Sequence, residues 1–220
     1  MYIKYLGHSA FEIETGNSKL LIDPFIAPNP QYKPSNISTI FVTHGHSDHL
    51  GSAIEISKKQ ASNIFAVFEL ANYCATNGAN SVGVSFGGKL SFPWGWAVFM
   101  PAFHSSSTPD GQYAGSAASI IFDINGIKIY HAGDNCLNSE MKVIKEIYKP
   151  QIAMLPIGGH YTMDIEQAEI AAEWLGVKTV IPMHYNTFPA INADTERFKS
   201  RLELKGVNAI IMNKNDMLSL

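Results

Sequence analysis

Three histidines and one aspartate lie within six consecutive positions of this chain, in the segment H-G-H-S-D-H over residues 44–49. The segment directly follows an apolar run, Thr39–Thr43, that is predicted to be a buried strand. If the backbone stays extended past the strand, His44 and His46 project to the same side, and the following turn brings Asp48 and His49 to a second position. Neutral imidazoles and a carboxylate are ligands for zinc, iron or manganese. Strand packing gives no reason to gather such side chains, so the segment predicts adjacent sites for two metal ions.

Four ligands cannot complete two catalytic sites, so this interpretation requires further histidines or aspartates at later strand ends. Three candidates follow predicted strands: His104 after Trp96–Met100, Asp134 after Lys128–Tyr130 and His184 after Thr179–Pro182. Loops after neighbouring strands can converge on one edge of a sheet. The chain has eight histidines but only two cysteines, which argues against both a closed structural zinc site and a disulfide framework.

Hydrophobic patterning indicates strands that alternate with helices along the chain. Further strands are expected at Tyr2–Leu6, Ala10–Thr15, Lys19–Ile22, Ile64–Val67, Ser119–Ile124, Ile152–Leu155, Asn208–Met212 and Met217–Leu220. Helices are expected near Glu69–Thr76, Ser139–Tyr148, Ile165–Leu175 and Asp194–Leu204. Because the helices enter mainly between strands, the pattern predicts an α/β layered fold with more than one sheet. No repeat or hydrophilic linker interrupts the chain, so we expect one domain over residues 1–220.

Charge and hydropathy restrict the partners. Sixteen lysines and arginines stand against nineteen acidic residues, with no basic run, so we expect no nucleic-acid partner. No apolar run is long enough for a membrane helix and the N-terminus does not resemble a signal peptide, so we expect a cytoplasmic protein without a membrane partner. A small-molecule substrate fits these limits, and homo-oligomer formation stays open.

The ordered motifs resemble those of the metallo-β-lactamase-fold hydrolase superfamily, namely a strand-end Asp23, H-x-H-x-D-H, His104, Asp134 and His184. More narrowly, the segments L-I-D-P-F (21–25), A-F-H-S-S (102–106), Y-H-A-G-D (130–134) and I-P-M-H-Y-N-T-F-P (181–189) resemble a branch of metal-dependent hydrolases related to the ascorbate-phosphate lactonase group. The resemblance implies a four-layer αββα sandwich with a binuclear metal site at one edge of its β core.

Carried over residue by residue, the resemblance implies that His44, His46 and His104 hold the first metal, that Asp48, His49 and His184 hold the second, and that Asp134 bridges them. Zinc is the expected metal, with manganese or iron as alternatives. The implied reaction is attack by a bridging hydroxide on a small ester or lactone, with or without a phosphate group, with Asp48 among the groups that handle the proton. Two alternatives stay open: a phosphodiesterase or nuclease of the same fold, and a non-catalytic metal-binding sensor. In the bridging position this chain has Asp134 rather than a cysteine, which departs from the pattern of the β-lactam-hydrolysing enzymes. Lactamase activity is therefore not expected.

Four other residues carry separate hypotheses. His8, in a Gly-His-Ser sequence typical of this branch, is a candidate to face the substrate. His160 lies in a glycine-rich loop after a buried strand, where related chains often carry Asn; it is a candidate proton donor or anion-binding group, or simply a solvent-facing histidine. Asp23 either supports the metal loop by hydrogen bonding or only ends a strand. His131 is expected to be packed or to support a ligand.

Overall fold

The computed structural model describes residues 1–220, which form two compact units with one seven-stranded sheet each. Unit 1 comprises residues 1–88, 105–117 and 213–220, and unit 2 comprises residues 89–104 and 118–212. Each unit also contains α-helices, which agrees with the expected α/β class. The prediction of a single domain over residues 1–220 stays a prediction.

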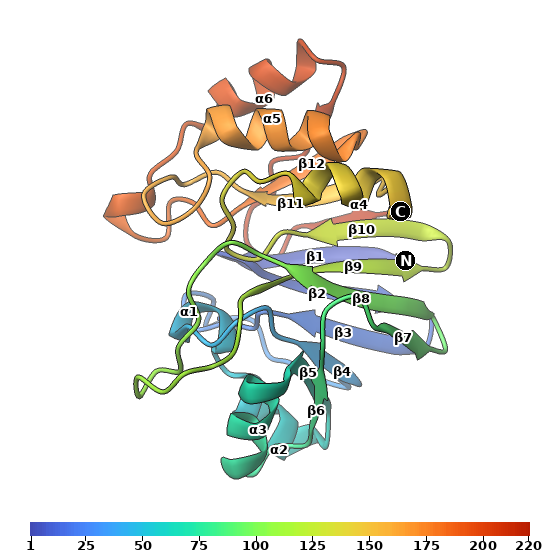
Figure 1. Ribbon diagram of the computed structural model, residues 1–220, viewed down its shortest axis with the longest axis vertical. Helices are drawn as coiled ribbons and strands as arrows, with labels where there is room; N and C mark the ends of the chain where they lie inside the picture. The colour runs from blue at the N-terminus through green and yellow to red at the C-terminus, as the bar shows by residue number, and fades with distance from the viewer. The chain divides into compact units, whose positions relative to one another are not determined.

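The sheet of unit 1 is half antiparallel and half parallel (Figure 1). In sheet order its strands are β14 (Met217–Ser219), β1 (Tyr2–Gly7), β2 (Ala10–Thr15), β3 (Ser18–Ile22), β4 (Thr39–Phe41), β5 (Asn63–Val67) and β6 (Ser81–Val84). Pairing is antiparallel from β14 to β3 and parallel from β3 to β6. β4 is buried at every position, as expected of a parallel strand that is covered on both faces.

Three helices belong to unit 1: α1 (Ser47–Leu50), α2 (Ala53–Gln60) and α3 (Phe68–Thr76). α2 contacts β5, and α3 contacts β5 and β6 (Figure 1). Ile56 of α2 and Leu70 and Cys74 of α3 are buried, so each helix turns an apolar face inward. α1 is a single turn, and it carries Asp48 and His49.

The sheet of unit 2 has the same division into an antiparallel and a parallel half. In sheet order its strands are β7 (Lys89–Phe92), β8 (Gly95–Pro101), β9 (Ala118–Ile124), β10 (Ile127–His131), β11 (Ile152–Pro156), β12 (Thr179–Met183) and β13 (Asn208–Ala209). Pairing is antiparallel from β7 to β10 and parallel from β10 to β13.

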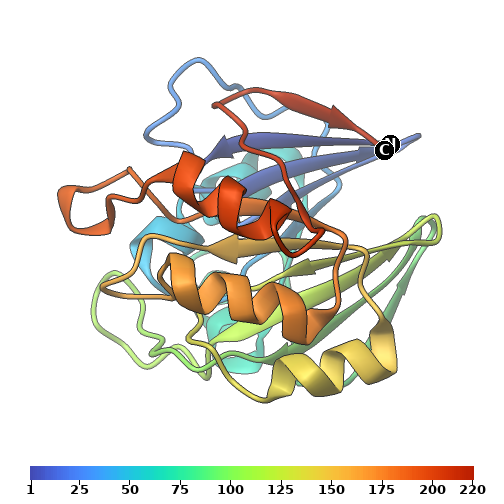
Figure 2. The same ribbon diagram turned by 90° about the horizontal axis from the view of Figure 1, so that it is seen from above.

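Three helices and one 3-10 turn connect the strands of unit 2. They are α4 (Glu140–Tyr148), α5 (Ile165–Leu175), η1 (Pro189–Ile191) and α6 (Thr195–Glu203). α5 contacts both α4 and α6, and Figure 2 shows it in orange between the yellow α4 and the red α6. Local residues determine both ends of α5. At its start the Asp164 side chain accepts a hydrogen bond from the Gln167 N–H, and at its end Gly176 adopts a left-handed conformation.

The structure contains every predicted strand and helix. Most of their ends differ from the predicted ends by no more than two residues, and the largest difference, three residues, is at β13. That strand, expected to extend to Met212, ends at Ala209. The sequence reading missed α1, α2, β6 and β7. β6 and β7 have only four residues each, and β6 includes a glycine, so neither gives a clear periodic signal.

Four candidate residues lie directly after strands in the parallel halves of the two sheets or three residues beyond them. In unit 1, Asp23 follows β3 and His44 follows β4; in unit 2, Asp134 follows β10 and His184 follows β12. Side chains that follow adjacent parallel strands gather at one edge of a sheet, the usual place for a binding site in α/β folds. None of the six α-helices has the length and apolar character that crossing a membrane requires.

Candidate metal centre

A buried hydrogen bond joins His49 of α1 to Asp23 after β3. The His49 Nδ1 lies 2.7 Å from Oδ2 of Asp23, and both side chains are fully buried. A carboxylate can only accept, so the His49 Nδ1 carries the proton and its Nε2 keeps a lone pair for a metal. This confirms the supporting hydrogen bond that the resemblance suggested for Asp23, and it is the usual way in which a protein orients a ligating imidazole.

Thr43 extends this network to His44, a role that the sequence reading missed. Its backbone N–H donates to Asp23 Oδ1 at 2.8 Å, and its hydroxyl donates to Asp23 Oδ2 at 2.7 Å. The single hydroxyl proton is then used, so the contact of 3.1 Å between Thr43 Oγ1 and His44 Nδ1 has the imidazole as donor. His44 therefore also keeps its Nε2 lone pair. The only sequence signal was a hydroxyl residue directly before the first histidine.

The other ligand candidates of unit 1 lie close to these two histidines. The His44 Nε2 and His46 Nδ1 are 3.0 Å apart. His44 and His49 each place a ligand atom within 4.8 Å of the other, and the same limit holds among His8, Asp48 and His49. The structure thus brings together all four members of the H-x-H-x-D-H segment.

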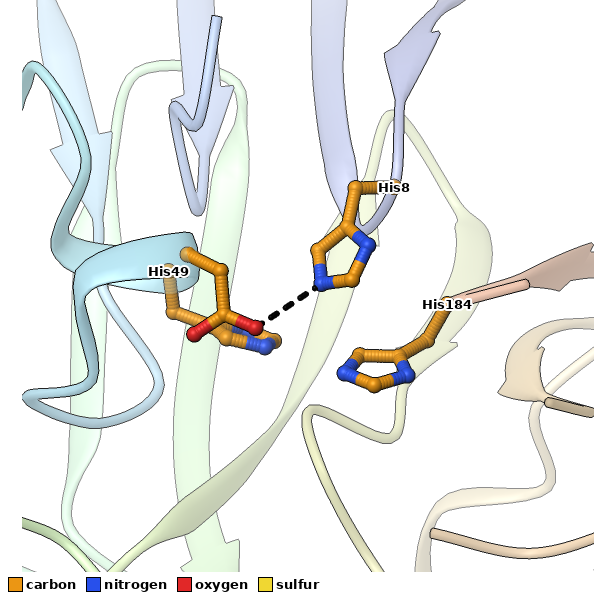
Figure 3. A group of neighbouring side chains, drawn as sticks. His8, His49 and His184 are labelled. Carbon is orange, nitrogen blue, oxygen red and sulfur yellow. Dashed lines mark hydrogen bonds and ion pairs between the residues drawn. The ribbon is translucent and has the colours of Figure 1, made fainter. Parts of the chain in front are cut away.

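His8, at the end of β1, contacts one of these ligand candidates. Its Nε2 lies 3.1 Å from Oδ2 of Asp48, the contact drawn as a dashed line in Figure 3, and its ring meets that of His49 edge-on at a centroid distance of 5.7 Å. The His8 side chain is fully buried, whereas that of Asp48 is 25% exposed. His8 is therefore placed to orient Asp48, and its predicted contact with substrate stays a prediction.

Several of these residues have an unusual backbone conformation. His8, Asp23, His184 and His160 have positive φ values of 56°, 44°, 53° and 57°. Non-glycine residues adopt this region at an energetic cost, and such residues concentrate at functional sites.

In unit 2, Asp134 lies between two histidines. Its Oδ2 is 3.1 Å from the Nε2 of His184 and 3.5 Å from the Nε2 of His104. Asp134 and His184 are buried, and His104 is 14% exposed. The structure therefore brings together the three strand-end residues that the sequence predicted, within this unit.

Asn135 connects the loops that carry these residues, and the sequence reading missed it. Its Oδ1 accepts a hydrogen bond of 2.9 Å from the backbone N–H of Phe103, next to His104. Its backbone oxygen accepts one of 3.1 Å from the N–H of Met163, in the loop that carries His160. Asn135 is buried, with 1% of the residue exposed. An amide side chain next to Asp134 in the sequence was the only signal for this role.

The last two histidines of unit 2 have different surroundings. His131 is fully buried, and its Nδ1 accepts a hydrogen bond of 3.1 Å from the Gly133 N–H, which confirms that it is packed. His160 is exposed, with its ring edge-on to that of Tyr161 at 4.3 Å. Gly158, two residues earlier, packs on the carbonyl oxygen of His184. The loop that carries His160 therefore packs against His184 at Gly158, whereas His160 itself is exposed to solvent.

The donor atoms of the two clusters fit a divalent metal such as zinc, manganese or iron. All are imidazole nitrogens or carboxylate oxygens, with no thiolate among them. The Asp23 and Thr43 bonds leave the Nε2 atoms of His44 and His49 free of protons, which metal ligation requires.

Comparisons with known proteins agree with this chemistry. A family model described as "Beta-lactamase superfamily domain" matches residues 2–184. A UPF0173 metal-dependent hydrolase of Thermus thermophilus is 41% identical, covering 99% of this chain and 98% of the relative, and one of Staphylothermus marinus is 44% identical, covering 96% and 95%. The solved structure of Igni18, a metallo hydrolase from Ignicoccus hospitalis, is 37% identical with a TM-score of 0.89 and covers 99% of this chain and 97% of that one. The fold is therefore that of the metallo-β-lactamase superfamily, and the chain belongs to this superfamily and, within it, to the UPF0173 metal-dependent hydrolases.

Proposed function

We propose that this metal-dependent hydrolase uses two metal ions to hydrolyse a small ester or lactone. The proposed ligands are His44, His46 and His104 for the first ion and Asp48, His49 and His184 for the second, with Asp134 bridging both. Zinc is the proposed metal, and manganese and iron are alternatives. The observation that carries the proposal is the pair of ligand clusters, H-x-H-x-D-H with its Asp23 support and Asp134 between two histidines.

The charges of this ligand set suit a hydrolytic reaction. Two divalent ions carry four positive charges, and Asp48 and Asp134 neutralise two of them. When bound, such ions would lower the pKa of a coordinated water towards neutrality and would polarise a substrate oxygen. The remaining positive charge favours substrates whose reacting group becomes negative, such as a carbonyl or phosphoryl centre.

Other groups of the chain have proposed roles around this centre. Asp23 holds His49, and Thr43 holds His44, each in the tautomer whose Nε2 carries no proton. Asp48, which is partly exposed, accepts the proton released during the attack. His160, exposed at the tip of its loop, donates a proton to the leaving group or binds an anionic substituent of some substrates.

Metal analysis and a substrate panel test the proposal. Purified protein should contain close to two metal ions per chain, and one or none would contradict the binuclear site. Chelation should abolish hydrolysis, and adding back the metal should restore it. Among chromogenic esters, lactones and bis-aryl phosphates, we expect turnover of esters or lactones; turnover of phosphodiesters alone would instead support the phosphodiesterase or nuclease alternative.

Variants separate catalysis from binding. Asp134→Ala and His184→Ala should lose activity on every substrate, whereas His160→Ala should change activity on only some. Equal loss in Asp134→Ala and His160→Ala would contradict a substrate-specific role for His160. If fully metallated protein hydrolyses no substrate of the panel, that result supports the alternative of a non-catalytic metal-binding sensor. The cytoplasmic location, the small-molecule substrate and the lack of a nucleic-acid partner stay predictions.

A further inference from the structure

We propose that a cavity of unit 1 binds an apolar, positively charged part of the substrate; this deepens the proposed function and rests on it. The cavity has a volume of about 210 Å³ and is lined by Phe68, Glu69, Phe86 and Tyr113, together with residues from the end of β5 and from β6. We call it the aromatic pocket. No residue of the metal clusters lines it, so it is separate from the ligands themselves.

The side chains of the aromatic pocket favour a cation. Three of them carry aromatic rings, and Phe68 and Tyr113 are 61% and 72% exposed, so their faces are available to a ligand. Glu69 is the only charged residue of the lining, which includes no lysine or arginine. Aromatic faces and a carboxylate attract an ammonium group and repel an anion. A phosphate is therefore disfavoured at this end of the substrate.

Strand register places this pocket beside the H-x-H-x-D-H segment. β4 and β5 are parallel neighbours, with Phe41 opposite Phe65. β4 leads to His44 three residues beyond Phe41, and β5 leads to Phe68 three residues beyond Phe65. Adjacent strands lie about 4.8 Å apart. Phe68, which lines the pocket, therefore follows β5 at the same sheet edge at which His44 follows β4.

One loop, residues 105–117, touches both places. At the ligand segment, the Gly45 N–H donates to Ser106 Oγ at 3.2 Å, and a Cβ on Gly45 would lie 2.6 Å from that of Ala114. At the pocket, a Cβ on Gly115 would lie 2.5 Å from Glu69 Oε2. Gly115 also has a φ of 74°, which favours glycine. The loop thus packs against the ligand segment at one point and against Glu69 at the other, with Tyr113 between them in sequence.

A binding experiment tests the pocket without any hydrolysis. Benzyltrimethylammonium chloride, neutral benzyl alcohol and benzenesulfonate are titrated into the metallated protein and followed by backbone amide NMR shifts. We expect saturable shifts at Ser85 and Ser116, which line the pocket, with the cation binding more tightly than the neutral probe and the anion most weakly. Absence of saturable shifts there, or equal affinity for cation and anion, would overturn the proposal.

Two exposed positions allow matched variants. Glu69→Gln should weaken the binding of benzyltrimethylammonium about three- to fivefold, as expected for a solvent-accessible charge. The binding of benzyl alcohol should not change in this variant. Tyr113→Ala should weaken both probes. Glu146→Gln, an exposed glutamate on α4, is the control and should change neither. Equal cation binding by Glu69→Gln and by the unaltered protein would contradict the role of Glu69.

A kinetic comparison then relates the pocket to turnover. Acetylthiocholine and its neutral isostere 3,3-dimethylbutyl thioacetate differ only in charge, and thiol release reports hydrolysis of both. We expect a lower KM for the cationic ester, and this preference should disappear in Glu69→Gln while kcat changes little. Hydrolysis of both esters with equal KM values would overturn the proposed role of the aromatic pocket and leave the proposed function intact. Cation binding by NMR with no hydrolysis of any ester or lactone in the panel contradicts the proposed function and not the pocket.

Discussion

The Nδ1 of His49 donates a hydrogen bond to Oδ2 of Asp23 over 2.7 Å, and both side chains are fully buried. This bond fixes the tautomer of His49, and the same carboxylate fixes that of His44 through Thr43. One aspartate that binds no metal in the proposed ligand set therefore prepares two ligands from different elements.

Asp23→Asn should lower metal affinity about 10- to 100-fold, the usual cost of losing a supporting carboxylate. The amide can donate as well as accept, so it no longer dictates the His49 tautomer. Competition with a chromogenic chelator measures the change. Asp123→Asn, at the β9–β10 turn, is the control and should keep full affinity; unchanged affinity in Asp23→Asn would contradict the supporting role.

His8→Ala should reduce metal affinity about tenfold by releasing Asp48, because it removes the 3.1 Å contact. Removing the imidazole also leaves a space among buried groups, so a stability effect must be separated from it. His8→Asn keeps a donor and a residue type that tolerates positive φ, and it should recover part of the affinity. If His8→Ala instead keeps metal affinity but raises KM, the histidine contacts substrate.

Gly158→Ala should disturb His184 through the backbone. A Cβ at this position would lie 2.3 Å from the His184 carbonyl oxygen and 2.8 Å from Ile191 Cβ, so the His184 turn must move. We expect lower metal content in a protein that still folds, measured by elemental analysis and circular dichroism. Gly88→Ala, whose Cβ would meet nothing closer than 3.5 Å, should behave like the unaltered protein. Normal metal content in Gly158→Ala would show that this packing is not needed.

Tyr32→Phe should destabilise unit 1 by about 1.5–3 kcal/mol, because it removes a hydrogen bond to a buried carboxylate. The Tyr32 hydroxyl donates to Glu12 Oε2 at 2.5 Å, and Glu12 is 4% exposed. Burial, followed by the bond to Glu12 and its charge, raises the pKa of Tyr32 above its ordinary value of 10.0.

This shift also predicts a pH dependence. Because the folded-state pKa of Tyr32 is raised, its contribution is fully present below about pH 10 and is lost as the pH rises further, where the unfolded chain ionises first. The free energy of unfolding should thus fall more steeply above about pH 10 in the unaltered protein than in Tyr32→Phe. Equal slopes in chemical denaturation would contradict this.

The two cysteines should react at very different rates. Cys74 is buried, and desolvation raises its pKa to about 12, so almost no thiolate is present near pH 8. Cys136 is exposed. Native protein should therefore release one equivalent of thionitrobenzoate rapidly from 5,5′-dithiobis(2-nitrobenzoate), and denatured protein two. Cys136→Ser should remove the fast phase, and two fast thiols in native protein would refute the assignment.

The sequence by itself determined most of the secondary structure and named the proposed ligands. Runs such as Ile152–Leu155 form parallel strands that are buried on both faces, so every position is apolar. Such continuous apolar runs are easily recognised as strands in the sequence. α5 begins at Asp164 and ends at Gly176 for reasons that are local to those residues. Helix α2 and strands β6 and β7 were missed because short segments carry too few periods to stand out.

Only the tertiary structure decided how these residues support one another. Asp23 and His49 are 26 positions apart, and Asn135 and Phe103 are 32 apart, so no local pattern predicts either bond. The protonation of His44 and His49 follows from counting the protons of Thr43 and Asp23, which requires their distances. Burial can be predicted from a periodic sequence, because buried positions repeat with the period of the helix or strand. A hydrogen-bond network depends on which distant strand ends lie close together, and only the folded structure determines this.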